Sequence, residues 1–95
     1  MDEQEAQALA EMMSAFATAS RLQILYGLVE GERSVDQLAK VTGLSASTVS
    51  QQLRVLRHLR IVAVRREGRN AYYRPADEHV VDVLATIRHH LRHGD

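Results

Sequence analysis

The sequence predicts a mainly α-helical chain with one β-hairpin. Apolar residues recur every three or four positions over most of the 95 residues, which is the period of helices that bury one face. Two short helical segments flank a turn that contains a glycine, and two alternating, strand-like segments follow directly. The expected fold class is therefore a winged helix-turn-helix, formed as a single domain over residues 1–95.

The first two helices are expected over residues 3–17 and from Ser20 to about Val29. Both segments carry apolar side chains at helical spacing. Ser20 can cap the start of the second helix, and Gly31 can end it. A domain of this size buries a modest share of its surface, so a dimer interface would add useful core. We expect a homodimer that is formed through the first and last helices.

Residues 34–60 are expected to form the helix-turn-helix. Ser34 and, three residues later, Gln37 have the spacing of a capping box. Gly43 can adopt the left-handed conformation that follows a helix, and Ser45 can cap the second helix. An ordinary helical hairpin would share these signals, so the segment that follows has to separate the two alternatives.

Residues 61–75, "IVAVRREGRNAYYRP", change the period from helical to alternating. "EGRN" is expected to be a turn between two strands, with Gly68 and Asn70 at positive φ, and Pro75 is expected to stop the second strand. A hairpin directly after a helix-turn-helix is the arrangement of a wing. This segment therefore favours a DNA-binding domain over a plain helical hairpin.

The net charge is zero, but the charged residues are segregated along the chain. Residues 1–39 contain seven acidic residues and two arginines, whereas residues 45–74 contain seven arginines and one glutamate, a net charge of +6. Arginine suits bidentate contacts with phosphate and guanine. A cationic segment of this density favours double-stranded DNA as the partner over the alternative of solvated helix faces.

The second helix of the helix-turn-helix divides into two faces at about 100° per residue. Val49, Leu53 and Leu56 share the face that is expected to be core. Recognition helices contact base edges mainly with their N-terminal residues, so the polar residues at the start of the opposite face are expected to read bases, and Arg54 to reach phosphate. The expected DNA-binding residues are Ser47, Thr48, Ser50, Gln51, Arg54 and, at the wing tip beside the neighbouring minor groove, Arg69.

Residues 77–93 are expected to form a terminal helix that carries an apolar stripe and four of the five histidines. Asp77 can cap this helix. A stripe at the end of so small a chain indicates a partner helix, and the same helix of a second copy is the expected partner. The stripe consists of Val80, Val83, Leu84, Ile87 and Leu91.

Three of these histidines, His79, His90 and His93, share one face beside the stripe. His79 and His90 lie about 16 Å apart along one helix, which is too far for one ion with metal–nitrogen bonds of about 2.0–2.1 Å. In an antiparallel pair, Asp77 and His79 of one chain meet His90 and His93 of the other, which gives two sites per dimer. This ligand set suits Zn²⁺ or Co²⁺. In the alternative interpretation, Asp77 only caps the helix and the histidines form a polar end.

Together these segments resemble the ArsR/SmtB family of metal-sensing winged-helix repressors over nearly the whole chain. "SRLQILYGL" is similar to the family's second helix, "LSASTVSQQLRVLRHLRIVAVRREGRNAYYR" to its recognition helix and wing, and "DEHVVDVLATIRHHLRH" to its terminal pattern D-x-H-x10-H-x2-H/E. The resemblance implies an apo dimer that holds an operator and is released on binding Zn²⁺ or Co²⁺, so that metal efflux or storage genes are transcribed. A hydrogen bond from His90 to the backbone near Arg60 is the expected link between the two sites.

The family's other metal site uses two cysteines on the first helix of the helix-turn-helix. Ser34 and Asp36 stand in those places within "ERSVDQL", and the chain has no cysteine. Oxygen atoms are poor ligands for arsenic, cadmium or lead. A sensor of that type is therefore not expected.

Three other functions stay open: a Ni²⁺ or Co²⁺ sensor of the same family with extra ligands from Asp2, Glu3 or His89, a winged-helix regulator without metal control, and a metal-buffering protein. An enzyme is not expected, because a catalytic metal would need a fuller pocket and a nearby acid or base. The acidic N-terminus does not resemble a signal peptide, and no apolar run approaches the ~18 residues of a membrane helix. We expect a cytoplasmic location, no membrane contact and no protein partner besides a second copy.

Overall fold

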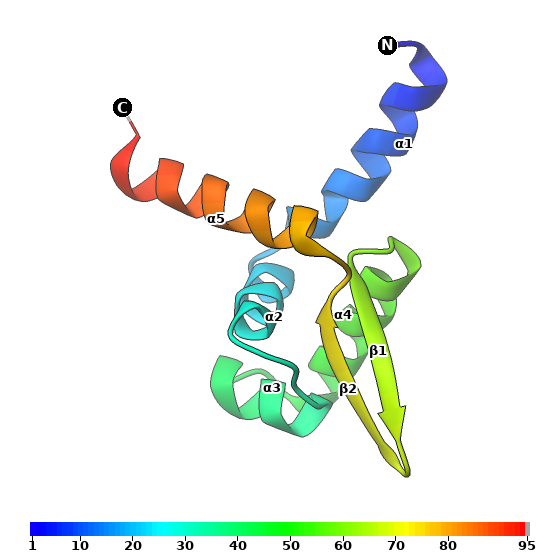
Figure 1. Cartoon of the computed structure of the whole chain (residues 1–95), viewed down its shortest axis with the longest axis vertical. Helices are drawn as coiled ribbons and strands as arrows, with labels where there is room; N and C mark the ends of the chain where they lie inside the picture. Colours follow the sequence, from blue (N-terminus) through cyan, green and yellow to red (C-terminus); the bar gives the residue numbers. More distant parts are fainter. Residues whose placement is uncertain (95) are drawn as a thin grey trace.

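The computed structural model describes residues 1–94 and shows, within them, a winged helix-turn-helix (Figure 1). Helices α2 to α4 are followed directly by a two-stranded antiparallel sheet, which confirms the expected fold class. The elements in chain order are α1 (Glu3–Met13), the 3₁₀ helix η1 (Ser14–Phe16), α2 (Ala19–Val29), α3 (Val35–Thr42), α4 (Ala46–His58), β1 (Val62–Glu67), β2 (Asn70–Pro75) and α5 (Glu78–His93).

Two boundaries near the N-terminus differ from expectation. α1 ends at Met13 and the chain tightens into η1, whereas the sequence predicted one helix over residues 3–17. The cap of α2 is Thr18 and not Ser20, because η1 turns the chain before Thr18 and leaves Ser20 inside the first helical turn. Thr18 has the extended backbone of an N-cap, and its hydroxyl accepts a hydrogen bond from the backbone N–H of Arg21 at 3.3 Å.

Hydrogen bonds from Arg21 link the junction between η1 and α2 to the recognition helix, α4. Its guanidinium donates to the backbone oxygens of Ser14 at 2.8 Å and Ala15 at 3.2 Å. A third hydrogen bond reaches Oε1 of Gln52 on α4 at 3.1 Å. The segment that follows α1 is therefore joined directly to α4.

The predicted capping residues and the left-handed glycine of the helix-turn-helix are confirmed. Ser34 and Gln37 make both hydrogen bonds of the capping box, at 3.2 and 2.9 Å. Gly43 has a φ of 78°, and Ser45 caps α4 by accepting a hydrogen bond from the N–H of Thr48 at 3.0 Å. Each of these contacts satisfies a group at a helix end that the helix itself leaves free.

The wing begins where α4 ends. α4 stops at His58, two residues before the predicted end, and Arg60 takes a φ of 63°, which turns the chain into β1. Tyr73 of β2 exchanges two backbone hydrogen bonds with Arg33, at 2.8 and 3.1 Å, in the loop between α2 and α3. The hairpin is therefore anchored to the helical part of the domain at its base.

The turn of the wing consists of Gly68 and Arg69, because Glu67 and Asn70 are the last paired residues of the two strands. Gly68 has a φ of 61°, as expected. Asn70 does not take the positive φ that the sequence predicted. It already belongs to the paired strand, where the backbone is extended.

The core lies between α2, α3, α4 and the base of the wing. α4 buries Val49, Leu53 and Leu56, as predicted, whereas α1 buries no residue and α5 buries only Val80 and Leu84. The buried apolar residues are Ala15, Ile24, Leu25, Leu28, Leu38, Val49, Leu53, Leu56, Ile61, Val62, Val80 and Leu84. Within residues 1–94, no helix is both long and apolar enough to cross a membrane.

Candidate DNA interface and metal-binding helix

The recognition helix α4 presents most of its predicted DNA-binding residues on its free face. Its exposed candidates are Ser47, Ser50, Gln51 and Arg54. Thr48 is half-buried, and its hydroxyl accepts a hydrogen bond from the Ser45 hydroxyl at 3.0 Å, so it takes part in the helix cap. Arg69 is exposed in the two-residue turn at the tip of the wing.

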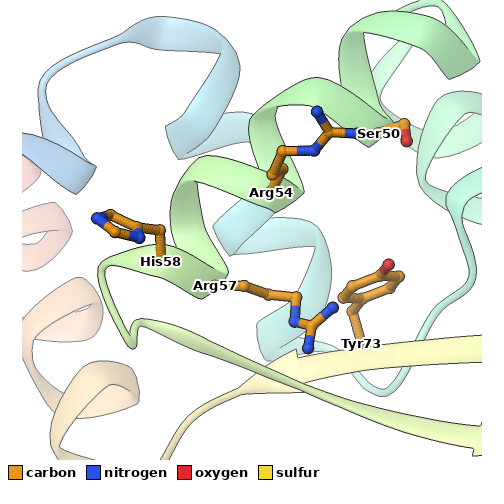
Figure 2. Close-up of a pocket in the computed structure, with 5 residues that line it drawn as sticks. All are labelled: Ser50, Arg54, Arg57, His58 and Tyr73. Carbon is orange, nitrogen blue, oxygen red and sulfur yellow. The ribbon is translucent and has the colours of Figure 1, made fainter.

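A groove of about 450 Å³ lies between α4 and the wing (Figure 2). It is lined by Ser50, Arg54, Arg57, His58 and Tyr73. Sequence reasoning did not single out Arg57 or Tyr73. Arg57 follows Ser50 by two helical turns, so the helical wheel carried a signal for it. Tyr73 needed the hairpin register, which pairs it with Val64 and not with Arg65.

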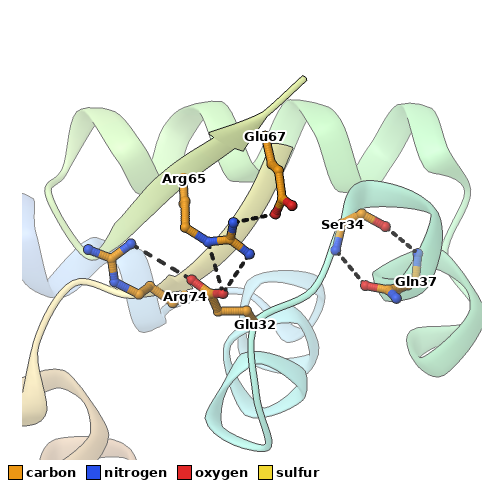
Figure 3. A network of polar contacts seen from close by, with 6 residues as sticks. All are labelled: Glu32, Ser34, Gln37, Arg65, Glu67 and Arg74. Atoms are coloured by element: carbon orange, nitrogen blue, oxygen red, sulfur yellow. Dashed lines mark hydrogen bonds and ion pairs between the residues drawn. The ribbon is translucent and has the colours of Figure 1, made fainter. Parts of the chain in front are cut away.

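The opposite face of the wing is closed by ion pairs to the loop between α2 and α3 (Figure 3). Arg65 donates from Nε and Nη2 to Oε1 of Glu32 at 3.2 and 3.1 Å, and from Nη1 to Oε2 of Glu67 at 2.6 Å. The carboxylates of Glu67 and Glu32 raise the pKa of Arg65. Arg74 lies 4.0 Å from Oε2 of Glu32. The charges of these two arginines are therefore balanced within the chain.

The start of α5 places two of the predicted metal ligands side by side. Asp77 caps the helix, because its Oδ1 accepts a hydrogen bond from the N–H of Val80 at 3.2 Å. The same oxygen lies 3.5 Å from Nδ1 of His79, whose side chain is 92% exposed. Within residues 1–94, no hydrogen bond occupies the second oxygen of Asp77, Oδ2. Both side chains are thus available to a ligand that approaches from outside the chain.

The other two predicted ligands, His90 and His93, lie at the far end of α5. Both are exposed, and the ring of His93 lies beside that of His89, with 4.6 Å between the centroids. Within the described part of the chain, no three His, Cys, Asp or Glu residues lie close enough together to hold a metal ion. One chain therefore brings the four predicted ligands together only as two separate pairs. Three imidazoles and one carboxylate are nevertheless a donor set that fits Zn²⁺ or Co²⁺.

α1 and α5 share a second property: both expose apolar side chains. Figure 1 shows the two helices projecting from the core, away from the tip of the wing. On α5, Val83, Ile87 and Leu91 are 46%, 61% and 82% exposed. On α1, the exposed apolar side chains include Leu9, Met12 and Met13. Exposed apolar side chains on both helices are typical of a protein–protein interface.

An exposed recognition helix, an adjoining wing and a cationic face define a winged helix-turn-helix DNA-binding protein. The sequence model of the bacterial regulatory proteins of the arsR family matches residues 18–64. The chain belongs to this ArsR family of transcriptional regulators, which are DNA-binding proteins and not enzymes.

Individual relatives and structures agree with this assignment. The transcriptional repressor SmtB homolog of Synechocystis is 44% identical over 96% of this chain and 69% of its own. The HTH-type transcriptional regulator NmtR of Mycobacterium tuberculosis is 42% identical over 98% of this chain and 78% of its own. The homodimeric winged helix-turn-helix DNA-binding domain of Mb0332 from Mycobacterium bovis has a TM-score of 0.85 at 36% identity, covering 98% of this chain and 93% of that chain.

Proposed function

We propose that the protein is a metal-responsive repressor that binds operator DNA as an apo homodimer and loses operator affinity when it holds Zn²⁺ or Co²⁺. Loss of operator affinity would derepress genes for metal efflux or storage. The observation that carries the proposal is the placement of Asp77 and His79 at one end of α5 and of His90 and His93 at the other. Both pairs are exposed on a helix whose apolar side chains Val83, Ile87 and Leu91 are exposed as well.

The dimer is proposed to form through α1 and α5. An antiparallel arrangement of the two α5 helices would cover Val83, Ile87 and Leu91 and bring the start of one helix to the end of the other. The Mb0332 domain, which has a similar fold, is homodimeric, and this supports a homodimer of the present chain. Each of two symmetric sites would then take Asp77 and His79 from one chain and His90 and His93 from its partner.

The DNA contacts are proposed to come from the exposed face of α4 and from the wing. Ser47, Thr48 and Gln51 would contact base edges near the helix N-terminus, with Ser50 beside them. Arg54 would reach phosphate, and Arg69 would enter or flank the neighbouring minor groove. None of these residues belongs to α5, so DNA binding and metal binding use separate parts of each chain.

A bound Zn²⁺ or Co²⁺ ion would supply a tetrahedral centre that links the two chains. The rest of the regulation is assigned to this chain's own groups. The α5 helices would fix the relation between the two recognition helices, and the ring of His90 would donate to the backbone near Arg60, where α4 passes into the wing. By linkage, operator binding must weaken metal binding by the same factor as metal binding weakens operator binding.

The direct test is operator binding by the purified protein, measured by fluorescence anisotropy with chelator and then with Zn²⁺, Co²⁺ or Ni²⁺. We expect tight binding with chelator and at least several-fold weaker binding with the cognate metal. His79→Ala and His90→Ala should bind the operator like the parent and no longer respond to metal. A parent protein that binds the operator equally with and without every metal would instead be a winged-helix regulator without metal control.

A mixed dimer tests the exchange of ligands between chains. One chain carries Asp77→Ala and His79→Ala, and the other carries His90→Ala and His93→Ala. If the sites form between chains, one site keeps all four ligands and the heterodimer binds one Co²⁺ with the intense visible absorption of a tetrahedral ion. A confirmed heterodimer with no intact site would reject this arrangement.

The position of His89 supports a second candidate, a Ni²⁺ or Co²⁺ sensor. Its ring lies 4.6 Å from that of His93, so it offers an additional imidazole to an ion that needs more than four ligands. In that case the Co²⁺ complex would show the weak absorption of an ion with more than four ligands, and His89→Ala would change that spectrum. An intense spectrum that does not change in His89→Ala would favour the four-ligand site.

A further inference from the structure

We infer that the groove between α4 and β2 seats a phosphate of the DNA backbone, held by Arg54 and Arg57 together with the hydroxyl of Tyr73. The inference rests on the proposed DNA-binding function and assigns phosphate contacts to two residues, Arg57 and Tyr73, that the sequence did not single out. The groove opens between the recognition helix and the wing (Figure 2). A duplex that is contacted by both elements has to pass its backbone across this gap.

The first observation concerns which arginines have partners. Arg65 and Arg74 are paired with Glu32, and Arg65 also with Glu67. Within residues 1–94, Arg54 and Arg57 have neither an ion pair nor a side-chain hydrogen bond, and no acidic side chain lines the groove. Two unbalanced guanidinium groups on one wall create a positive potential that favours an anion.

The second observation concerns Tyr73. Its backbone is held from both sides, because it pairs with Val64 on β1 and exchanges two hydrogen bonds with Arg33. Its half-buried ring packs against the core, so the orientation of the side chain is fixed. The hydroxyl makes no hydrogen bond within the described residues and borders the groove beside Arg57 (Figure 2). It is therefore a preorganised donor for a phosphate oxygen.

The third observation is that the two faces of the hairpin differ in chemistry. Neighbouring residues of a strand point to opposite faces. Arg65 and Tyr72 are paired partners on the face closed by Glu32, where the Arg65 guanidinium lies 5.0 Å from the centre of the Tyr72 ring. Tyr73 therefore lies on the other face, which α4 borders. On this face, within residues 1–94, Arg54 and Arg57 have no ion pair, whereas Arg65 and Arg74 on the first face are paired with Glu32.

The test is the salt dependence of binding to operator and to an unrelated duplex, measured without metal. The slope of log Kobs against log[salt] is negative, and Arg57→Gln should make it less steep. The change should be about 0.9 for each phosphate that is no longer neutralised, or about 1.8 per dimer. Binding should weaken equally on both duplexes, because a phosphate contact carries no sequence information. Tyr73→Phe, which removes only a neutral hydroxyl, should weaken binding roughly 5-fold per phosphate and leave the slope unchanged.

Arg92→Gln is the matched control. It removes the same charge from an exposed position on the last turn of α5, far from the groove, and should leave the slope at the parent value. Arg57→Lys keeps the charge and should keep the slope, so it separates the effect of the charge from that of a damaged fold. Thermal unfolding of each variant checks that the fold is retained.

Two results would overturn the inference: an unchanged slope in Arg57→Gln, or a change of slope that Arg92→Gln reproduces. A parent protein that binds no duplex at low salt would overturn the proposed function as well, so the two failures are distinguishable.

Discussion

The DNA-binding part of this protein contains the buried core of the chain, whereas the terminal helices leave most of their apolar side chains exposed. From α2 to the wing, a cluster of apolar residues is buried, although Val29, Val41 and Val55 are exposed. Helix ends in this region are capped, and ion pairs link the hairpin to the loop between α2 and α3. α1 buries no residue, and Ile87 and Leu91 on α5 remain 61% and 82% exposed. One chain thus specifies the candidate DNA-binding surface, and in the proposed dimer the second chain would set the spacing of two such surfaces.

The proposed control of DNA binding follows the same division. The predicted metal ligands lie on α5 or at its N-cap, and they form two pairs at the opposite ends of this helix. A metal site that is completed only across two chains acts directly on the dimer geometry. It can therefore alter operator affinity without touching any residue of the DNA-binding face.

The largest effect is expected from placing a carboxylate in the centre of the α5 stripe. Ile87→Asp leaves the core of the single chain intact but puts a charge into the proposed interface, where burying it would cost several kcal/mol. We expect a folded monomer at micromolar concentration in sedimentation, with much weaker operator binding. Thr86→Asp adds the same charge at the preceding position, off the stripe, and should remain dimeric. A stable Ile87→Asp dimer would show that the α5 stripe is not the dimer interface.

The loss of stability should be independent of protein concentration for a core substitution and should depend on it for an interface substitution. Leu53→Ala removes a side chain that is 1% exposed and should lower the free energy of unfolding by about 2–5 kcal/mol at every protein concentration. Leu91→Ala should be destabilising only at concentrations where the parent is dimeric. Chemical denaturation over a dilution series measures both. An equal effect of Leu91→Ala at all dilutions would mean that α5 is completed within its own chain.

Two substitutions on the DNA-binding part should separate base reading from backbone binding. Gln51→Ala should reduce discrimination between operator and unrelated DNA by about 1–3 kcal/mol, the value of a bidentate base contact. Arg69→Ala should weaken binding to both duplexes more evenly. If Gln51→Ala discriminates as well as the parent, Gln51 does not read bases.

The smallest effect separates the two roles of Asp77. Asp77→Ala removes the helix cap and should lower stability by about 1 kcal/mol, whereas Asp77→Asn can still cap and should be nearly neutral. Both variants should bind Co²⁺ more weakly, because neither supplies a carboxylate. Co²⁺ binding by Asp77→Asn at the parent's affinity would show that Asp77 is only a cap.

Features that depend on neighbours three or four residues apart could be predicted from the amino-acid sequence. Ser34 and Gln37, Gly43 and the Ser45 cap were correctly predicted, because hydrogen bonds at helix ends are local. The core face of α4 followed from the helical period. The spacing of Asp77, His79, His90 and His93 likewise sets their positions along α5, whatever the rest of the chain does.

Which arginines have an acidic partner could be seen only in the folded chain. Arg65 pairs with Glu32, 33 residues earlier, and the sequence contains no local signal for that pairing. The same holds for the groove, where the hairpin register places Tyr73 beside α4, and for the cap of α2, where η1 selects Thr18 over Ser20. These features depend on how segments of the chain are oriented relative to one another in space. Composition and periodicity do not contain that information.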